Sequence, residues 1–268
     1  MKTIKFLVLT FISLFAVVYI VYLTIIYFNQ QNMVFRASGL PKNHIFNFYS
    51  DFDEVLMPTT DNKNLHGLLF KIPNPKGLIF YLHGNKGNVD MWGNSAIIYN
   101  TMGYDIFYLD YRGFGKSEGA IIDEKQVHED VATAYKQVTK DYKKKNTIII
   151  GYSIGTGLAT YLATNQEHKK LVLQAPFYNF TEFTGPLAPG FPDFMKKFQF
   201  QNNLHLQKIT TPIYIFHGTN DKLIPIENSV RLQKLQPNSA ILYCLEGQNH
   251  VGINQNEVFI EKMKEILK

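Results

Sequence analysis

The sequence contains a single cysteine, Cys244, which excludes an intrachain disulfide and argues against a thiolate metal site. Charged residues make up only 18% and hydrophobic residues 46%, a balance that argues against a disordered chain. The net charge is only +5, and no basic stripe interleaved with aromatic residues is present, so we expect no nucleic-acid partner. Because Cys244 lies inside the apolar run AILYCL, we expect it to be buried.

The chain opens with a long segment that has no charge. From Phe6 to Phe28 there are 23 uncharged residues, and a membrane-spanning helix needs about 20. A cleaved secretory signal has a shorter apolar core of about 7–15 residues and a small-residue cleavage site, which this segment lacks. We therefore predict an uncleaved signal anchor over residues 1–29, followed by a linker over residues 29–50.

The flanking charges predict how this anchor is oriented. Lys2 and Lys5 lie nearer to the apolar run than Arg36 and Lys42 do. The positive-inside rule then places the N-terminus in the cytoplasm and the remainder of the chain on the non-cytoplasmic side of a membrane.

Residues 30–268 are expected to form one domain in which strands alternate with helices. This order predicts an α/β fold with a mostly parallel sheet and helices on both faces. Residues 176–211 break the alternation and are rich in proline and phenylalanine, so we expect a short cap insertion above the sheet. The expected strands are 54–57, 65–72, 77–82, 106–110, 147–150, 171–174, 213–216 and 240–245, and the expected helices are 91–102, 124–141, 154–164 and 258–267.

Two segments, GKSEG at 115–119 and GYSIG at 151–155, fit the pattern that presents a nucleophilic serine. Such an elbow needs a strand directly before the serine and a helix directly after it. Ser153 has both, and we expect Gly157 to let that helix pack close to the sheet. Ser117 has neither, and the charge of Glu118 would lie beside a developing oxyanion. We interpret Ser153 as the candidate nucleophile and Ser117 as a loop residue.

A serine nucleophile needs a base, and the base needs a carboxylate that orients it. With this elbow the expected order along the chain is Ser, then Asp or Glu, then His. His250, in the loop after strand 240–245, is the candidate base. Asp221, in HGTNDKLIP after strand 213–216, is the candidate carboxylate, and Asp193 is a weaker one because no strand holds it.

The third requirement is an oxyanion hole, whose donors are backbone N–H groups. Ile154 directly follows the candidate nucleophile and supplies the first donor. Asn85, in the segment HGNKGN after strand 77–82, supplies the second. We expect His83 to be a buried residue that braces this loop.

The motifs HGNKGN, DYRGFGKSEG, GYSIGTG, HGTNDKLIP and the late Asn249–His250 pair occur in an order that resembles the α/β-hydrolase superfamily. The chain is most similar to the branch of single-pass, membrane-anchored alpha/beta hydrolase domain proteins, over about residues 30–268. The resemblance implies an eight-stranded sheet with the α/β-hydrolase fold and no cofactor. One departure is Tyr152, where that branch often has arginine.

The leading hypothesis is a membrane-anchored serine hydrolase that cleaves an acyl ester, thioester or amide, with a small or lipid-like acyl substrate and neither metal nor cofactor. The alternative is a membrane-tethered binding or scaffold protein that keeps the fold without turnover. The cap phenylalanines either line an acyl pocket or only pack the cap onto the sheet, and the sequence leaves both open. They are Phe177, Phe180, Phe183, Phe191, Phe194 and Phe198.

Overall fold

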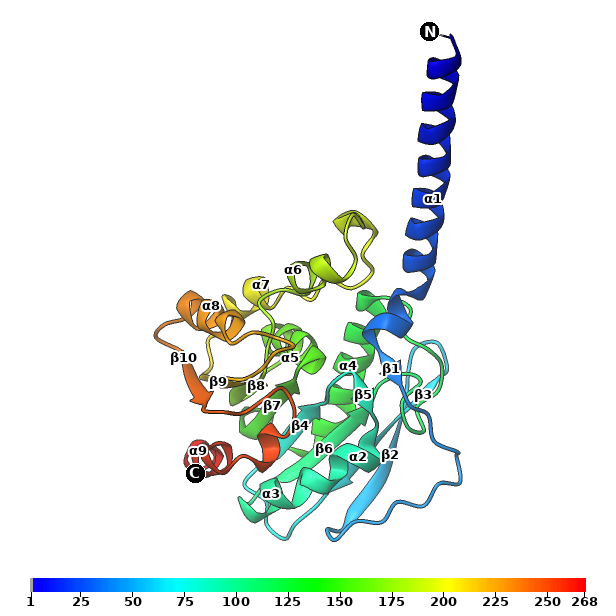
Figure 1. Cartoon of the computed structure of the whole chain (residues 1–268). Helices are drawn as coiled ribbons and strands as arrows, with labels where there is room; N and C mark the ends of the chain where they lie inside the picture. Colours follow the sequence, from blue (N-terminus) through cyan, green and yellow to red (C-terminus); the bar gives the residue numbers. More distant parts are fainter. Residues whose placement is uncertain (1) are drawn as a thin grey trace.

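The computed structural model describes residues 2–268 and is built around an eight-stranded sheet (Figure 1). The strand order is β10-β9-β8-β7-β4-β6-β3-β2, and all neighbours are parallel except the pairs that involve β3. The predicted fold class, a mostly parallel eight-stranded sheet, is confirmed. The strands are β2 (Phe52–Pro58), β3 (Asn64–Phe70), β4 (Leu78–Leu82), β6 (Asp105–Asp110), β7 (Thr147–Tyr152), β8 (Lys170–Gln174), β9 (Ile213–Gly218) and β10 (Ala240–Leu245).

Helices cover both faces of this sheet, as expected for parallel strands that are apolar along their whole length. One face packs against α4 (Glu124–Val138), α5 (Ile154–Asn165) and α8 (Glu227–Leu235). The other face packs against α3 (Ala96–Thr101) and α9 (Glu257–Ile266). Every residue of the central strands β4 and β7 is buried.

The helix expected over 91–102 is in fact two short pieces, α2 (Val89–Trp92) and α3, joined by a 3₁₀ turn. The first piece begins early because the side chain of Asn88 accepts a hydrogen bond from the N–H of Asp90 and caps it. The turn starts at Gly93, a poor helix former, where a Cβ atom would lie 2.8 Å from the ring of Phe48.

The prediction that Cys244 is buried is wrong, because its side chain is exposed. It lies on β10, which is an edge strand with only β9 beside it. A residue on an edge strand is covered less completely than one in the middle of the sheet.

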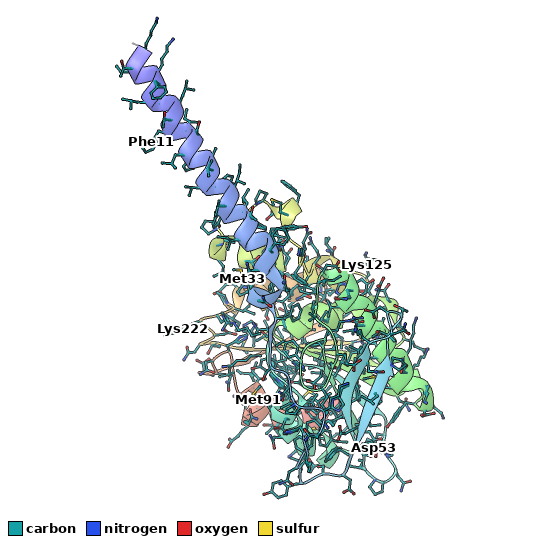
Figure 2. All side chains as sticks on the ribbon, turned by 90° about the vertical axis from the view of Figure 1, so that its right-hand side faces the viewer. Phe11, Met33, Asp53, Met91, Lys125 and Lys222 are labelled. Carbon is teal, nitrogen blue, oxygen red and sulfur yellow. The ribbon has the colours of Figure 1, made fainter. Side chains whose placement is uncertain are left out.

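The N-terminal helix α1 (Lys2–Val34) is longer than predicted, and it projects from the domain as one continuous rod (Figure 1). It is long and apolar enough to cross a membrane, and its most apolar stretch is not buried by the rest of the chain. Side chains such as that of Phe11 point away from the helix axis into open space (Figure 2). Residues 29–34 contain neither proline nor glycine, so nothing in the sequence ends the helix at residue 29.

The segment expected to be a linker instead packs on the domain. Phe35 and Phe46 are buried, and β1 (Arg36–Ala37) pairs with β5 (Lys86–Gly87). The chain is therefore attached to the domain from the end of α1 onward.

The cap residues 176–211 carry α6 (Phe180–Thr184) and α7 (Asn202–Leu206). A Cβ atom on Gly157 would lie 2.7 Å from the Cβ of Phe200, so this glycine admits the cap against α5. The expectation that Gly157 brings α5 close to the sheet is wrong. That role falls to Gly155, which packs against the carbonyl groups of Leu82 and His83.

Candidate active site

Ser153 occupies a sharp turn between β7, which ends at Tyr152, and α5, which begins at Ile154. Its backbone angles are φ 52° and ψ −117°, in a region that non-glycine residues rarely adopt. The N–H of Ser153 donates to the carbonyl oxygen of Gln174 at 2.9 Å, which helps to hold this conformation. The serine is thereby placed at the N-terminus of α5, at the carboxyl ends of the parallel strands.

The structure brings His250 and Asp221 to this serine from two other strand ends. His250 Nε2 lies 3.0 Å from Ser153 Oγ, and His250 Nδ1 lies 2.7 Å from Asp221 Oδ2. The weaker candidate, Asp193, instead lies on the cap and forms an ion pair with Lys196 at 2.8 Å. The three residues therefore form one continuous chain of hydrogen bonds.

Hydrogen bonds to its carboxylate keep Asp221 ionised. Burial alone would raise the pKa of Asp221, but donors from His217, His250 and the N–H of Ile224 hold that pKa well below its usual range. The N–H groups of Leu223 and Ile224 both donate to Oδ1 at 2.9 Å. The carboxylate is thus fixed in orientation as well as in charge.

His217 is a residue of this site that the sequence reasoning missed. Its Nε2 lies 2.7 Å from the carbonyl oxygen of Ile224 and 3.3 Å from Asp221 Oδ2. Because a carbonyl oxygen only accepts, Nε2 carries a hydrogen and points it toward both oxygens. Its position at the end of a strand, four residues before Asp221, was the signal that could have found it.

Asn85 and Ile154, the predicted oxyanion donors, line one cavity together with Ser153. The carbonyl oxygen of Asn85 accepts from the N–H of Arg36 at 2.9 Å, which fixes the loop after β4. His83 is buried beneath that loop, and its Nδ1 lies 2.7 Å from the carbonyl oxygen of Gly84. Burial lowers the pKa of His83, consistent with a neutral bracing residue.

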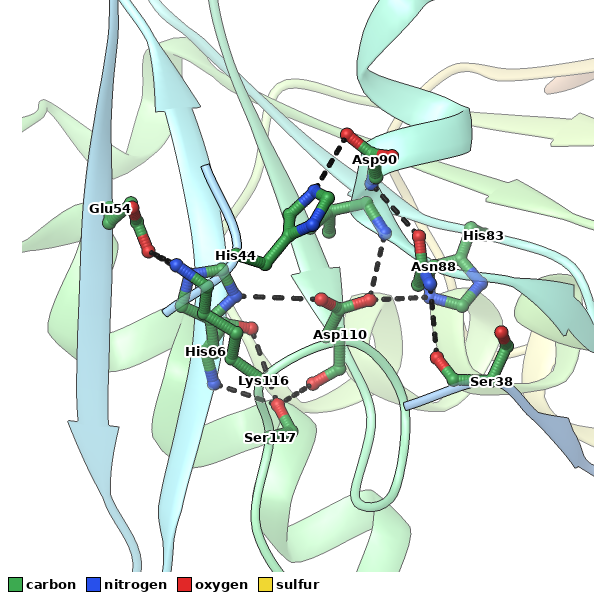
Figure 3. A network of polar contacts seen from close by, with 11 residues as sticks. Ser38, His44, Glu54, His66, His83, Asn88, Asp90, Asp110, Lys116 and Ser117 are labelled. Carbon is green, nitrogen blue, oxygen red and sulfur yellow. Dashed lines mark hydrogen bonds and ion pairs between the residues drawn. The ribbon is translucent and has the colours of Figure 1, made fainter. Parts of the chain in front are cut away.

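Ser117 belongs to a different polar network, which also contains His66 and Asp110 (Figure 3). Its Oγ accepts from the N–H of His66 at 2.8 Å and donates to the carbonyl oxygen of Asp110 at 2.6 Å. The ring of His66 is directed elsewhere, with Nε2 3.0 Å from Glu54 Oε2. Ser117 therefore ties its loop to the backbone of β3 and β6, and within the described residues its Oγ is hydrogen-bonded to backbone groups and to no side-chain base.

Tyr152, the residue that departs from the resembled branch, contacts His250 directly. Its hydroxyl donates to the carbonyl oxygen of His250, and the two rings meet edge to face at 6.0 Å. The indole ring of Trp92 also packs against the ring of Tyr152, at a centroid distance of 5.1 Å. Tyr152 therefore connects the serine elbow to the loop that carries His250.

A cavity of about 600 Å³ adjoins Ser153, within the usual range for small-molecule sites. Its walls come from the C-terminal end of α1 and from the cap. Five of the six cap phenylalanines line it, whereas Phe194 does not and is 86% exposed. The lining phenylalanines are Phe177, Phe180, Phe183, Phe191 and Phe198.

Within residues 2–268, no group of three or more His, Cys, Asp or Glu side chains is arranged to hold a metal ion. Of the three hydrogen-bonded residues Ser153, His250 and Asp221, Ser153 lines the cavity.

The eight-stranded sheet, the strained serine elbow and the cap over the strand ends define an α/β hydrolase, and the comparisons agree. Residues 73–205 match the family model described as serine aminopeptidase, S33. Human alpha/beta hydrolase domain-containing protein 17B is 29% identical over 228 residues, which cover 81% of this chain and 76% of the relative. The mouse protein 17C is 27% identical and covers 81% of this chain and 68% of its own length.

Solved structures show the same fold. An esterase of Pyrococcus furiosus superposes with a TM-score of 0.65 at 21% identity, covering 85% of this chain and 94% of its own. An alpha/beta hydrolase from Penicillium superposes with a TM-score of 0.67 at 17% identity, covering 81% and 98%. The resemblance to the α/β-hydrolase superfamily is therefore confirmed, and the chain has the α/β-hydrolase fold.

Proposed function

We propose that the protein is a membrane-anchored serine hydrolase that cleaves an acyl ester, thioester or amide through a Ser153–His250–Asp221 triad. The observation that supports this most strongly is the unbroken hydrogen-bond chain of 3.0 Å from Ser153 Oγ to His250 and 2.7 Å from His250 to Asp221. The strained backbone at Ser153 supports it independently, because such strain is typical of functional positions.

In this mechanism His250 Nε2 takes the proton of Ser153 Oγ as that oxygen attacks the substrate carbonyl carbon. Asp221 stays ionised and stabilises the imidazolium through its bond to Nδ1. His250 then gives its proton to the leaving group, and an acyl-enzyme is left on Ser153. A water molecule, deprotonated by His250, attacks the acyl carbonyl carbon. The bond from that carbon to Ser153 Oγ then breaks, His250 returns the proton to Oγ, and the acid is released.

The oxyanion formed in both steps would be stabilised by the backbone N–H groups of Ile154 and Asn85. The N-terminus of α5 adds a favourable electrostatic field, because its first N–H groups point toward the developing charge. Neither step needs a metal or a cofactor.

The proposed anchor is α1, with the N-terminus in the cytoplasm and the catalytic domain on the non-cytoplasmic side. Its length and composition support a membrane span, and Lys2 and Lys5 near its start support this orientation. The apolar cavity beside Ser153 supports a lipid-like acyl substrate.

A fluorophosphonate probe, which reacts with activated serines, tests the proposal on the full-length protein. We expect wild type and Ser117→Ala to be labelled and Ser153→Ala to stay unlabelled while remaining folded. Absence of labelling in folded wild type would favour the alternative, a membrane-tethered binding protein without turnover.

A further inference from the structure

The part of the cap nearest to α1, residues 185–192, has the sequence GPLAPGFP and no polar side chain. We refer to these residues as the cap tip. Its three prolines have no N–H group that would need a partner in lipid. Leu187 within it is 65% exposed, and Phe194 just beyond it is 86% exposed. Such a loop is poorly matched to water and well matched to a bilayer.

The cap tip lies against the side of α1 (Figure 1). The Tyr19 hydroxyl donates to the carbonyl oxygen of Gly190 at 2.7 Å, and that of Tyr22 donates to Pro189 at 2.8 Å. These bonds satisfy carbonyl groups that would be costly to leave unpaired in hydrocarbon. Nearer to the end of α1, Gln30 binds the cap just after the cap tip, donating to the carbonyl oxygen of Met195 at 3.0 Å and accepting from the N–H of Lys197 at 2.8 Å.

The length of α1 sets the level of this contact in a membrane. Counted from Phe6, a hydrocarbon core of about 30 Å takes roughly 20 helical residues and ends near Ile26. Tyr19 comes seven residues before Ile26, so it lies about 10 Å inside the core. Since Gly190 is bonded to Tyr19, the cap tip reaches the same depth.

The cavity beside Ser153 reaches the core boundary estimated at Ile26, and it also reaches the cap tip. Ile26 and Met33 of α1 form part of its wall, and Leu187 and Phe191 of the cap tip form another. The same cavity includes Ser153 at its inner end. Its outer walls are therefore the two elements that meet the lipid.

We propose that the cap tip inserts into the bilayer and that the cavity between it and α1 admits the acyl chain of a bilayer-resident ester directly from the lipid. This inference rests on the proposed function, because it takes Ser153 to be the residue that attacks the ester carbonyl. The chain would lie between Ile26 and Phe191, with its carbonyl group at Ser153. The helix α1 is then a wall of the substrate site as well as an anchor.

Kinetics on the full-length protein in phospholipid vesicles test the substrate route. Two substrates are compared, a vesicle-borne hexadecanoyl monoglyceride and a short, water-soluble butanoyl ester. Ile26→Trp, which fills the outer cavity, is expected to lower kcat/KM for the long chain by about tenfold or more relative to its effect on the short ester. Ile25→Trp is the matched control, because Ile25 lies at the same depth but is 58% exposed and does not line the cavity.

A peptide that carries the hexadecanoyl chain as a serine ester distinguishes the two sources of such a chain. Faster cleavage of the monoglyceride assigns the site to lipids, and faster cleavage of the peptide assigns it to acylated proteins. Equal effects of Ile26→Trp on the long and short esters, or no effect on either, would overturn the lateral route.

The depth of the cap tip is measured separately, so that it does not depend on turnover. In a Cys244→Ser background, a fluorophore on Leu187→Cys should be quenched by nitroxides in the lipid chains. The same label on Asp53→Cys, at the far end of the domain (Figure 2), should not be. Equal quenching at both positions would overturn insertion of the cap tip into the bilayer. A wild-type protein that is inactive on both esters would instead contradict the proposed function.

Discussion

The hydroxyl of Tyr152 donates a hydrogen bond to the backbone carbonyl oxygen of His250. Tyr152, the residue directly before Ser153, is therefore hydrogen-bonded to His250, whose ring contacts Ser153. The proposed nucleophile and its base are held together by the backbone as well as by their side chains. Arginine at this position, as in the resembled branch, would have to make a different contact.

Tyr152→Phe should keep the ring packing against Trp92 and lose only this hydrogen bond. We expect kcat on a short ester to fall by about tenfold, since small displacements of a base are costly, with KM nearly unchanged. Tyr214→Phe is the control, because Tyr214 lies near the start of β9 and its ring contacts the ammonium group of Lys170, which the substitution preserves. A Tyr152→Phe enzyme with wild-type kcat would show that the bond does not position His250.

Removal of triad members should have graded effects. Ser153→Ala and His250→Ala should each lower kcat on the order of 10³-fold or more. Asp221→Asn should cost less than Ser153→Ala, because the base survives and only its orientation and charge partner are impaired. Steady-state kinetics on one short ester measure all three, and circular dichroism checks that each variant is folded. An Asp221→Asn enzyme as active as wild type would remove Asp221 from the triad.

Ser117→Ala should affect stability and spare activity. The substitution removes the partner of the buried His66 N–H and of the Asp110 carbonyl group, at a cost of about 1–3 kcal/mol in the free energy of unfolding. Denaturation in urea measures that loss, and the kcat of the folded fraction should match wild type. A large loss of kcat at full folding would mean that the GKSEG loop takes part in the reaction.

His128 should make the protein sensitive to mild acid. Its ring stacks on Tyr161 at 3.7 Å, and burial lowers its pKa to about 3. Below pH ~6.5 the unfolded chain binds a proton at this histidine that the folded chain does not bind, so stability falls as the pH is lowered. His128→Phe keeps the stacking and should reduce the loss between pH 7 and pH 5 by about 1–2 kcal/mol.

Two neighbours of His128 bear on that prediction. Glu124 Oε1 lies 4.0 Å from His128 Nε2, but burial raises the pKa of Glu124 and so disfavours its negative charge. Positive charge on His205 opposes protonation of His128. The free energy of unfolding at pH 7, measured with urea, is the reference for each protein. Above pH 7 the stability of wild type and that of His128→Phe should depend on pH in a similar way. The same acid loss in both proteins would contradict the assignment to His128.

The sheet and the Ser153, His250 and Asp221 constellation could be predicted because their signals are local. Each lies in the turn or loop that follows an apolar strand, and parallel strands bring such loops together at one edge of the sheet. His217 was missed because its role depends on the fold of HGTNDKLIP, which brings Ile224 and Asp221 to one ring nitrogen. The exposure of Cys244 depends on strand order, and no periodicity within AILYCL carries that information.

The end of α1 was misplaced for a related reason. Hydropathy marks where an apolar run stops, but a helix stops only where its backbone loses partners. Gln30 is polar and yet buried, because the cap supplies both a donor and an acceptor for its side chain. Contacts between residues this far apart in the sequence are invisible to a reading of local pattern.

The uninterrupted course of α1 into the domain has a consequence for how the enzyme would meet its substrate. With no hinge between the proposed span and the docked Gln30, the proposed active site would be unable to swing away from the membrane that holds α1. Encounters would then take place in two dimensions, and the rate would follow the mole fraction of substrate in that membrane. Diluting the substrate with inert lipid at constant bulk concentration should slow turnover, whereas diluting the vesicles in buffer should leave it unchanged.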